Sequence, residues 1–365
     1  MPVRNHTFFS GLLVACLLGV STAAQDGSAW RDPSPHQVQF VTVDGDVRLE
    51  VLDWGGTGRP IVLLTGLGDT AHVFDDFALK LTQSGHVYGI TRRGYGASSI
   101  PSSGYGADRL GDDVLAVLES LKINRPILVG HSIAGQELSS IGSRYPERVA
   151  GLVYLDALFS YSYATPQELN LRATLAKLQN DLQVILERPF NPDGTLRPPD
   201  LVTAVLNAIP DVQRQLSSLP LATTPPPPPA SPTSADLASY AALNAFFVRT
   251  RGFGWPEAEM RQDNPPTPEG RLGPSRIPPS VRTAIINGAV QSFSDIRVPA
   301  LALCAMPGTS APDARRVRLE ARQAAFEKNV SGARVVRFPG AHHYFFLSIE
   351  AEVLREVVAF IDSLR

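Results

Sequence analysis

Compact apolar runs alternate with amphipathic stretches along most of this sequence, and that alternation limits the possible folds more than any other feature. The apolar runs lie at residues 60–66, 86–91, 125–130, 149–157, 298–305 and 333–338. Each run is typical of a strand that is buried on both faces of a parallel sheet. Helical patterns lie between them, at 107–123 and 134–145, and a closing helix is expected at 350–364. Strand and helix in alternation predict a three-layer α/β fold with a mostly parallel sheet.

Two segments depart from this alternation. Residues 40–54 alternate with period two around Asp44-Gly45, which predicts an initial β-hairpin. Residues 158–297 contain no strand-like run, but they have helical patterns near 166–187, 200–219, 235–250 and 279–293, together with a proline-rich loop at 223–232. We therefore predict a core of residues 25–157 and 298–365, interrupted by a helical cap at 158–297.

The N-terminus resembles a targeting segment. Arg4 precedes the apolar run Phe8–Val20, and small residues follow it, as in a secretory signal peptide that is cut near Ala24. The run is shorter than the roughly 20 apolar residues that span a bilayer, so we expect no stable membrane insertion once residues 1–24 are removed. The sequence "LVAC" that ends at Cys16 also resembles a bacterial lipobox. The protein is expected to be exported, either periplasmic or secreted, with a lipid anchor through Cys16 as the alternative.

Composition excludes several classes of partner. The chain has 33 Lys and Arg against 35 Asp and Glu and no long basic run, which argues against nucleic acid and favours a small, nearly neutral substrate. Cys16 and Cys304 are the two cysteines, so a chain that has lost its signal peptide has no disulfide framework. Cys304 is interpreted as a small buried apolar residue in a strand.

The stretch "GHSIAG" at residues 130–135 follows one predicted strand and opens a predicted helix. In that setting a G-x-S-x-G pattern indicates a nucleophile elbow, a sharp turn that holds a serine out toward substrate. Ser132 is the candidate nucleophile. Ala134 replaces the last glycine of the pattern, and alanine is the least disruptive substitute for it.

On these residues the chain resembles the α/β-hydrolase family over about 37–156 and 298–365, with the insertion as its cap. The resemblance implies an oxyanion hole made by the backbone N–H groups of Leu67, in the turn "TGLG" after the third strand, and of Ile133. Thr65 replaces the histidine that is usual in that turn. The turn "RRGYGAS" at 92–98 also matches the family, and we interpret it as structural.

The resemblance also implies a base and an acid. His342 and His343 lie in the loop before the last helix, and His343, which precedes Tyr344, is the expected base. A metal site there is disfavoured, because neighbouring residues rarely ligate together and no third ligand is evident. The acid is Asp156, at the end of the sixth strand, or alternatively Asp313, after the seventh. Either one would orient the imidazole and stabilise its charged form.

A serine nucleophile without metal or other cofactor favours hydrolysis of a small or medium apolar ester through an acyl-enzyme. Carbon–carbon bond or amide hydrolysis by the same residues is the alternative, and a non-catalytic binding protein on this fold is another. Aromatic residues of the cap could form an apolar lid; they are Tyr161, Tyr163, Phe246, Phe247 and Trp255.

The signal-peptide interpretation predicts a specific mature terminus. When the full chain is expressed in a secreting bacterium, the exported protein should begin near Gln25, because the small residues before it suit signal peptidase. Mass spectrometry of the N-terminal peptide measures this. A diacylated Cys16 at the start of the mature chain would instead establish the lipobox interpretation.

Overall fold

The computed structural model describes residues 30–187, 203–210, 212, 230–289, 293–306 and 314–364. Ser34–Arg365 forms one compact unit that is separate from Met1–Pro33. The predicted signal peptide, Cys16 and Asp313 lie outside the described residues, as does all but 230–232 of the proline-rich run. No helix among the described residues is long and apolar enough to cross a membrane.

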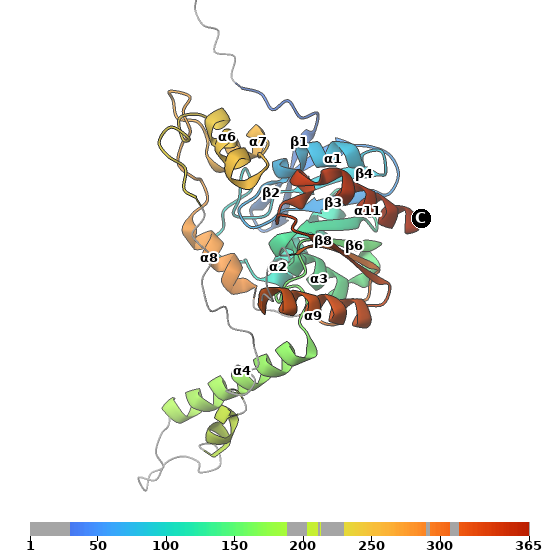
Figure 1. Ribbon diagram of the computed structural model, residues 1–365, viewed down its shortest axis with the longest axis vertical. Coiled ribbons are helices and arrows are strands. Elements are labelled where there is room, and N and C mark those ends of the chain that lie inside the picture. The colour runs from blue at the N-terminus through green and yellow to red at the C-terminus, as the bar shows by residue number, and fades with distance from the viewer. Residues whose placement is uncertain are drawn as a thin grey trace, which may run out of the picture. The chain divides into compact units, whose positions relative to one another are not determined.

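An eight-stranded sheet runs through the larger unit in the order β1-β2-β4-β3-β5-β6-β7-β8 (Figure 1). The strands are β1 Gln37–Asp44, β2 Val47–Gly55, β3 Pro60–Leu64, β4 His86–Ile90, β5 Ile127–His131, β6 Gly151–Leu155, β7 Ala300–Met306 and β8 Ala333–Pro339. β1 pairs antiparallel with β2, and β2 with β4, whereas every pairing from β4 to β8 is parallel. The predicted hairpin and all six predicted strands are confirmed.

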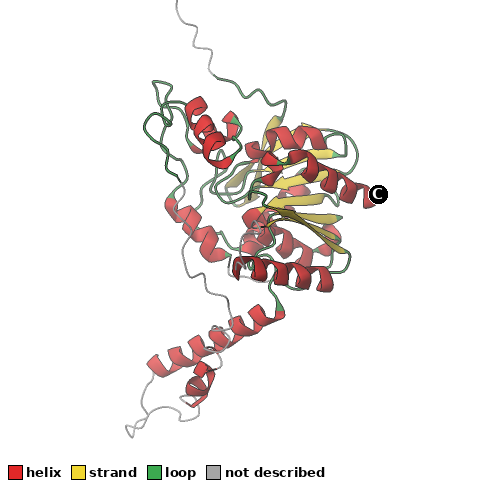
Figure 2. Ribbon diagram, in the orientation of Figure 1, coloured by secondary structure: helices red, strands yellow, loops and turns green. Residues whose placement is uncertain are grey.

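Helices cover both faces of the sheet, which confirms the three-layer arrangement (Figure 2). The helices of the core are α1 Asp75–Leu81, α2 Ala107–Ser120, α3 Gly135–Arg144, α9 Ala314–Asn329, α10 Phe345–Ser348 and α11 Glu350–Ser363. Two apolar clusters fill the spaces between layers. Residues of α2, α3 and α9 pack in one cluster, and residues of α1 and α11 pack in the other. Each buried strand contributes alternate side chains to the two clusters, which explains its continuous apolar pattern.

The segment between β6 and β7 is helical where the structure describes it. It contains α4 Pro166–Glu187, α6 Tyr240–Arg251, α7 Glu257–Asp263 and α8 Pro279–Gly288. The prediction for 166–187 is confirmed, α6 begins later than the expected 235, and α7 was not predicted. The seven residues of α7 are too few for a clear helical periodicity. We keep the name cap segment for residues 158–297, whose boundaries as a domain stay a prediction.

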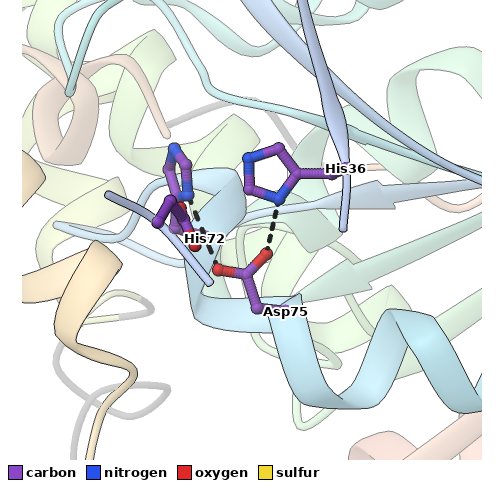
Figure 3. A group of neighbouring side chains, drawn as sticks. His36, His72 and Asp75 are labelled. Carbon is purple, nitrogen blue, oxygen red and sulfur yellow. Dashed lines mark hydrogen bonds and ion pairs between the residues drawn. The ribbon is translucent and has the colours of Figure 1, made fainter. Parts of the chain in front are cut away.

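A buried polar cluster joins the start of β1 to the loop that follows β3 (Figure 3). Asp75 Oδ1 lies 3.1 Å from His36 Nδ1 and accepts a hydrogen bond of 3.1 Å from Trp54 Nε1, while Asp75 Oδ2 lies 3.6 Å from His72 Nδ1. Burial by itself would raise the pKa of Asp75, but the two histidines lower it to about 2. The carboxylate is therefore charged at neutral pH and holds β1 against α1.

Candidate active site

Ser132 lies at the sharp turn between β5 and α3, as the sequence predicts. Its φ of 52° is in the left-handed region, which a residue other than glycine seldom adopts. The turn also needs close packing: a Cβ on Gly135 would lie 2.1 Å from the carbonyl oxygen of Ala157, and one on Gly130 would lie 3.1 Å from the Cβ of Ala134. Glycine is thus required at 130 and 135, while an alanine methyl is accommodated at 134.

His343 and Asp156 complete a hydrogen-bonded chain with this serine. His343 Nε2 lies 2.8 Å from Ser132 Oγ, and His343 Nδ1 lies 2.5 Å from Asp156 Oδ2. The other oxygen of Asp156 accepts a hydrogen bond of 3.0 Å from the backbone N–H of Ala305, on β7. The three residues expected from the sequence therefore meet with the separations of a nucleophile, a base and an orienting acid.

Sheet register explains why Ser132 and Asp156 are neighbours. β5 and β6 are parallel partners, and His131 is paired with Leu155. Ser132 and Asp156 are the next residue on each strand, and both have positive φ, 52° and 41°. The chain thus turns sharply at the same level of two adjacent strands, which directs both side chains to the carboxyl edge of the sheet.

The predicted oxyanion donors also follow paired strands. Leu64 of β3 is paired with Gly130 of β5, and Leu67 and Ile133 each lie three residues farther along. Their backbone N–H groups therefore belong to two turns at one edge of the sheet, beside Ser132. These are the positions in the fold at which the predicted oxyanion hole needs its two donors.

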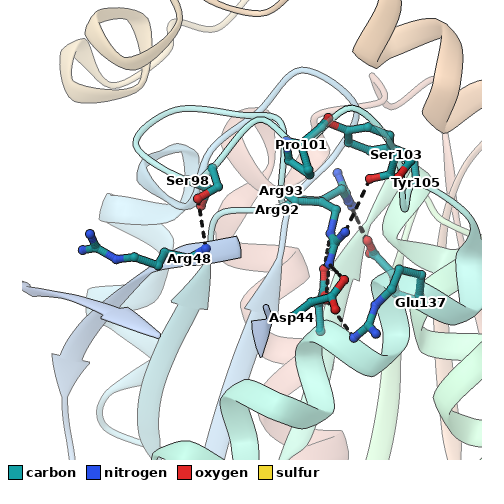
Figure 4. Close-up of polar contacts among 12 residues, drawn as sticks. Asp44, Arg48, Arg92, Arg93, Ser98, Pro101, Ser103, Tyr105 and Glu137 are labelled. Carbon is teal, nitrogen blue, oxygen red and sulfur yellow. Dashed lines mark hydrogen bonds and ion pairs between the residues drawn. The ribbon is translucent and has the colours of Figure 1, made fainter. Parts of the chain in front are cut away.

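Arg92 ties these two turns together (Figure 4). Its guanidinium donates to the carbonyls of Thr65 at 2.7 Å and Gly66 at 3.0 Å, and it forms a two-point ion pair with Glu137 of α3 at 2.5 and 2.9 Å. Burial by itself would lower the pKa of Arg92, but the Glu137 carboxylate raises it, so the group stays charged. The turn at 92–98 is structural, as interpreted from the sequence. Through Arg92 it holds the turn that carries Leu67.

The second arginine of that turn anchors it from the other side. Arg93 donates to both oxygens of Asp113 on α2 at 2.6 Å, and its Nη2 lies 3.4 Å from Asp44 Oδ2 at the end of β1 (Figure 4). Arg92 and Arg93 thus point in different directions: Arg92 links the turn after β3 to α3, and Arg93 links α2 to the end of β1. Neither arginine contacts the reacting atoms of the candidate triad in the described residues.

His131 and His342 are the histidines beside the candidate base. His131 is fully buried, lies 3.2 Å through Nε2 from the carbonyl oxygen of His343, and packs its ring 4.6 Å from that of His343. Burial lowers the pKa of His131, so it is a neutral packing residue at neutral pH. His342 is exposed and packs edge-to-face against Phe253 of the cap segment. His343 is thus the histidine that bonds to Ser132, as expected.

Aromatic residues of the cap segment divide into two groups. Tyr163 is buried in the core with 1% of its surface exposed, and Phe246 is buried within the cap. Phe247 and Trp255 line a pocket, and Tyr161 interacts with the side chain of Ser132. Burial raises the pKa of the Tyr161 phenol, which therefore stays protonated. Three of the five expected lid residues lie at the pocket or at the serine.

That pocket has a volume of about 250 Å³ and lies between the cap segment and two loops of the core. Leu67, Gly68, Asp69 and Tyr344 line it from the core. The cap contributes Leu243, Phe247, Arg251, Trp255, Glu259, Met260, Asp263, Asn264 and Arg282. Arg251, Glu259 and Arg282 have no local signal in the sequence, because single charged residues on helices are usually solvated.

Histidine and carboxylate groups suited to a metal ion gather elsewhere. His36, His72 and Asp75 present ligand-type atoms within 4.8 Å of one another (Figure 3). None of the candidate triad residues belongs to this group.

A family model described as the α/β-hydrolase fold matches residues 59–348, most of the chain. The chain belongs to the α/β-hydrolase fold family. Among solved structures, E-2-(acetamidomethylene)succinate hydrolase superposes with a TM-score of 0.59 and 18% identity, covering 90% of this chain and 99% of that one. This likeness shows the fold alone.

Two relatives of this α/β hydrolase resemble it in sequence. The 2-(acetamidomethylene)succinate hydrolase of Mesorhizobium japonicum is 28% identical over 34% of this chain and 44% of its own length. The AB hydrolase superfamily protein YisY of Bacillus subtilis is 35% identical over 35% of this chain and 46% of its own length. The α/β hydrolase thus spans less than half the length of these relatives.

Glu259 provides a test of how the cap is attached. It is 4% exposed, and its carboxyl accepts a hydrogen bond from the backbone N–H of Thr70 at 2.8 Å and bonds the Thr70 hydroxyl. Burial and then the nearby Asp69 raise its pKa well above the usual value. A raised folded-state pKa means that this group's stabilisation is present at acid pH and is lost as pH rises through that pKa.

We therefore expect Glu259→Gln to match the wild type in thermal stability near pH 5 and to exceed it at pH 8–9, because the amide oxygen can accept from the Thr70 N–H and the amide NH2 can donate to the Thr70 hydroxyl, without a charge. Thermal unfolding followed by circular dichroism at both pH values measures this. Glu257→Gln, on the same helix but part of a half-buried ion pair with Arg261, is the control and should show no such gain. A loss of stability in Glu259→Gln at every pH would contradict the protonated state.

Proposed function

We propose that this α/β hydrolase cleaves carboxylic esters through an acyl-enzyme formed on Ser132. The observation that carries the proposal is the continuous hydrogen-bonded chain Ser132–His343–Asp156, with separations of 2.8 and 2.5 Å. The left-handed backbone at Ser132 supports it, since such conformations are characteristic of functional turns.

In the first half of the reaction Ser132 Oγ attacks the ester carbonyl carbon while His343 Nε2 takes its proton. The carbonyl oxygen becomes an oxyanion, which accepts hydrogen bonds from the backbone N–H groups of Leu67 and Ile133. Each such donor typically lowers the barrier by about 2.7–4 kcal/mol. The intermediate collapses, His343 returns the proton to the leaving alcohol oxygen, and the acyl group stays on Ser132.

In the second half a water molecule attacks the acyl carbon, and His343 accepts its proton. The second oxyanion collapses with release of the carboxylic acid, and the proton returns to Ser132. Throughout, Asp156 remains ionised, fixes the imidazole tautomer with its N–H on Nδ1, and stabilises the imidazolium. The Ala305 N–H holds the carboxylate in place.

Amide or carbon–carbon bond hydrolysis by the same residues is the second candidate. It is supported by the relative whose name is 2-(acetamidomethylene)succinate hydrolase, since that substrate name contains an acetamido group. A panel of nitrophenyl esters, anilides and aryl diketones compares the three reactions. Preference for the esters supports the proposal, and preference for either other class replaces it.

Ser132→Ala should fold normally and lose ester hydrolysis by several orders of magnitude, because the nucleophile is removed while the oxyanion donors remain. A fluorophosphonate probe should label wild-type Ser132, as identified by peptide mass spectrometry, and leave the variant unlabelled. Ser139, buried on α3 and bonded to Tyr154, supplies the control variant Ser139→Ala, which should still be labelled. Absence of labelling in the wild type would favour a non-catalytic binding protein.

Substitution distinguishes the two candidate acids, Asp156 and Asp313. Asp156→Asn should lower kcat by up to about 10⁴-fold, because an asparagine favours the wrong imidazole tautomer and leaves the imidazolium without a counter-charge. Asp313→Asn should be nearly neutral, because Asp156 already occupies Nδ1 of His343. Steady-state kinetics on an activated ester, with circular dichroism to verify folding, measures both. A large loss of activity in Asp313→Asn, together with an active Asp156→Asn variant, would make Asp313 the triad acid instead.

A further inference from the structure

The pocket beside the candidate oxyanion turn contains two exposed arginines that have no counter-ion in the part of the chain that the structure describes. Within the described residues, neither Arg251 nor Arg282 forms an ion pair or a hydrogen bond through its guanidinium. Both line the pocket, Arg251 from the end of α6 and Arg282 from the first turn of α8. Arginine is the side chain best suited to hold a carboxylate by two parallel N–H bonds.

Arg282 lies directly over the turn that carries the oxyanion donor Leu67. A Cβ built on Gly68 would lie 3.2 Å from Arg282 Nη2 and 3.4 Å from its Cζ. The guanidinium is therefore in contact range of the residue that follows Leu67. A ligand group bound to Arg282 would lie close to a carbonyl held in the oxyanion hole.

Arg251 is held in place by aromatic faces. Its Cζ lies 4.8 Å from the ring centroid of Phe247 and 4.8 Å from that of Trp255, and both rings line the same pocket. Stacking of this kind fixes a guanidinium without using its N–H donors, so they stay available to a ligand. Trp255 in turn packs on Tyr344, which follows the candidate base His343.

The acidic residues of the pocket, in contrast, already have hydrogen-bond partners within the protein. Asp69 accepts hydrogen bonds of 3.1 Å from the Tyr344 hydroxyl and lies 3.6 Å from His131. Glu259 is bonded to Thr70 and held protonated by its burial, and Asp263 accepts a hydrogen bond of 2.6 Å from Ser275. The oxygens of these acids are thus engaged in hydrogen bonds, whereas the guanidinium N–H groups of Arg251 and Arg282 bond no described residue, so we expect the arginines to bind an anionic group of a ligand.

We propose that Arg251 and Arg282 form an anion subsite, and that the substrate is an ester whose acyl chain carries a second carboxylate, a monoester of a dicarboxylic acid. The proposal rests on the ester hydrolysis proposed above and names its substrate class. It replaces the nearly neutral, apolar ester expected from composition with an anionic ester, since the overall charge of a chain does not describe the charge within one pocket.

Turnover of matched esters by the full-length protein tests the subsite. The anionic esters are monoethyl succinate, glutarate and adipate, and their neutral counterparts of equal chain length are ethyl butanoate, pentanoate and hexanoate. In a pH-stat at pH 7.5, the wild type should prefer at least one anionic ester over its counterpart by tenfold or more in kcat/KM. Equal or lower kcat/KM for all three anionic esters would overturn the proposal.

Substitutions then assign the preference to the two arginines. Arg251→Gln and Arg282→Gln should each lower kcat/KM for the preferred anionic ester by roughly 10- to 100-fold, mainly through KM, because a charge-assisted hydrogen bond is lost. Neutral esters should change by less than about twofold. The control Arg249→Gln, on α6 but paired with Asp236, should alter neither. Equal losses for both kinds of ester would indicate a structural role and overturn the proposal.

Binding measured without turnover separates this inference from the proposed function. Isothermal titration calorimetry on the Ser132→Ala variant should give tighter binding of the preferred monoester than of its neutral counterpart, and adding Arg282→Gln should remove the difference. Failure of fluorophosphonate labelling with this binding difference intact would overturn the ester hydrolysis alone. Normal labelling without any binding difference would overturn the anion subsite alone.

Discussion

The buried guanidinium of Arg92 is the interaction on which the candidate site depends. It binds the carbonyls of Thr65 and Gly66 after β3 and the carboxylate of Glu137 on the helix after β5. Those two turns carry the two N–H groups proposed to stabilise an oxyanion. A buried charge is tolerated only with its counter-charge and its hydrogen bonds, so Arg92 and Glu137 hold each other as well as the turns. The orientation of Leu67 thus comes from a residue that does not touch substrate.

Two of the four non-glycine residues with positive φ among the described residues belong to the candidate triad, and the other two, Lys122 and Arg125, lie between α2 and β5. Ser132 and Asp156 both have left-handed backbones, at the ends of strands that pair through His131 and Leu155. Such conformations cost free energy and persist when surrounding contacts determine them. At Asp156 these contacts are its hydrogen bonds to Leu303 and Ala305 on β7, and at Ser132 they are the close packing around Gly130 and Gly135. These contacts therefore offset the backbone strain at Ser132 and Asp156.

Two side chains of α7 connect the cap segment to the core through polar contacts. Glu259 bonds Thr70, and Gln262 lies 3.1 Å from His72. Because Glu259 is bonded to the core in this way, the guanidinium groups of Arg251 and Arg282 remain to face a ligand. Helix α7 thus attaches the cap to the core, and the neighbouring helices α6 and α8 supply the arginines of the pocket.

The sequence by itself determined the strands, the core helices at 107–123, 134–145 and 350–364 and the position of Ser132, because each depends on contacts within a few residues. The core helices α1, α9 and α10 were not among the predicted helices. A buried strand must be apolar throughout, and a sharp turn must have glycine at 130 and 135. His343 came instead from the resemblance to the family, which places a histidine in the loop before the last helix.

The tertiary structure decided what depends on register between distant segments. The sequence left Asp156 and Asp313 as alternatives, and pairing of β5 with β6 is what puts Asp156 beside the serine, with the His343 loop closing over both. The helix α7, the link through Arg92 and the pocket arginines had no local signal. A charged side chain on a helix has the same sequence pattern whether water or a pocket faces it, and only the packing of the cap on the core distinguishes the two.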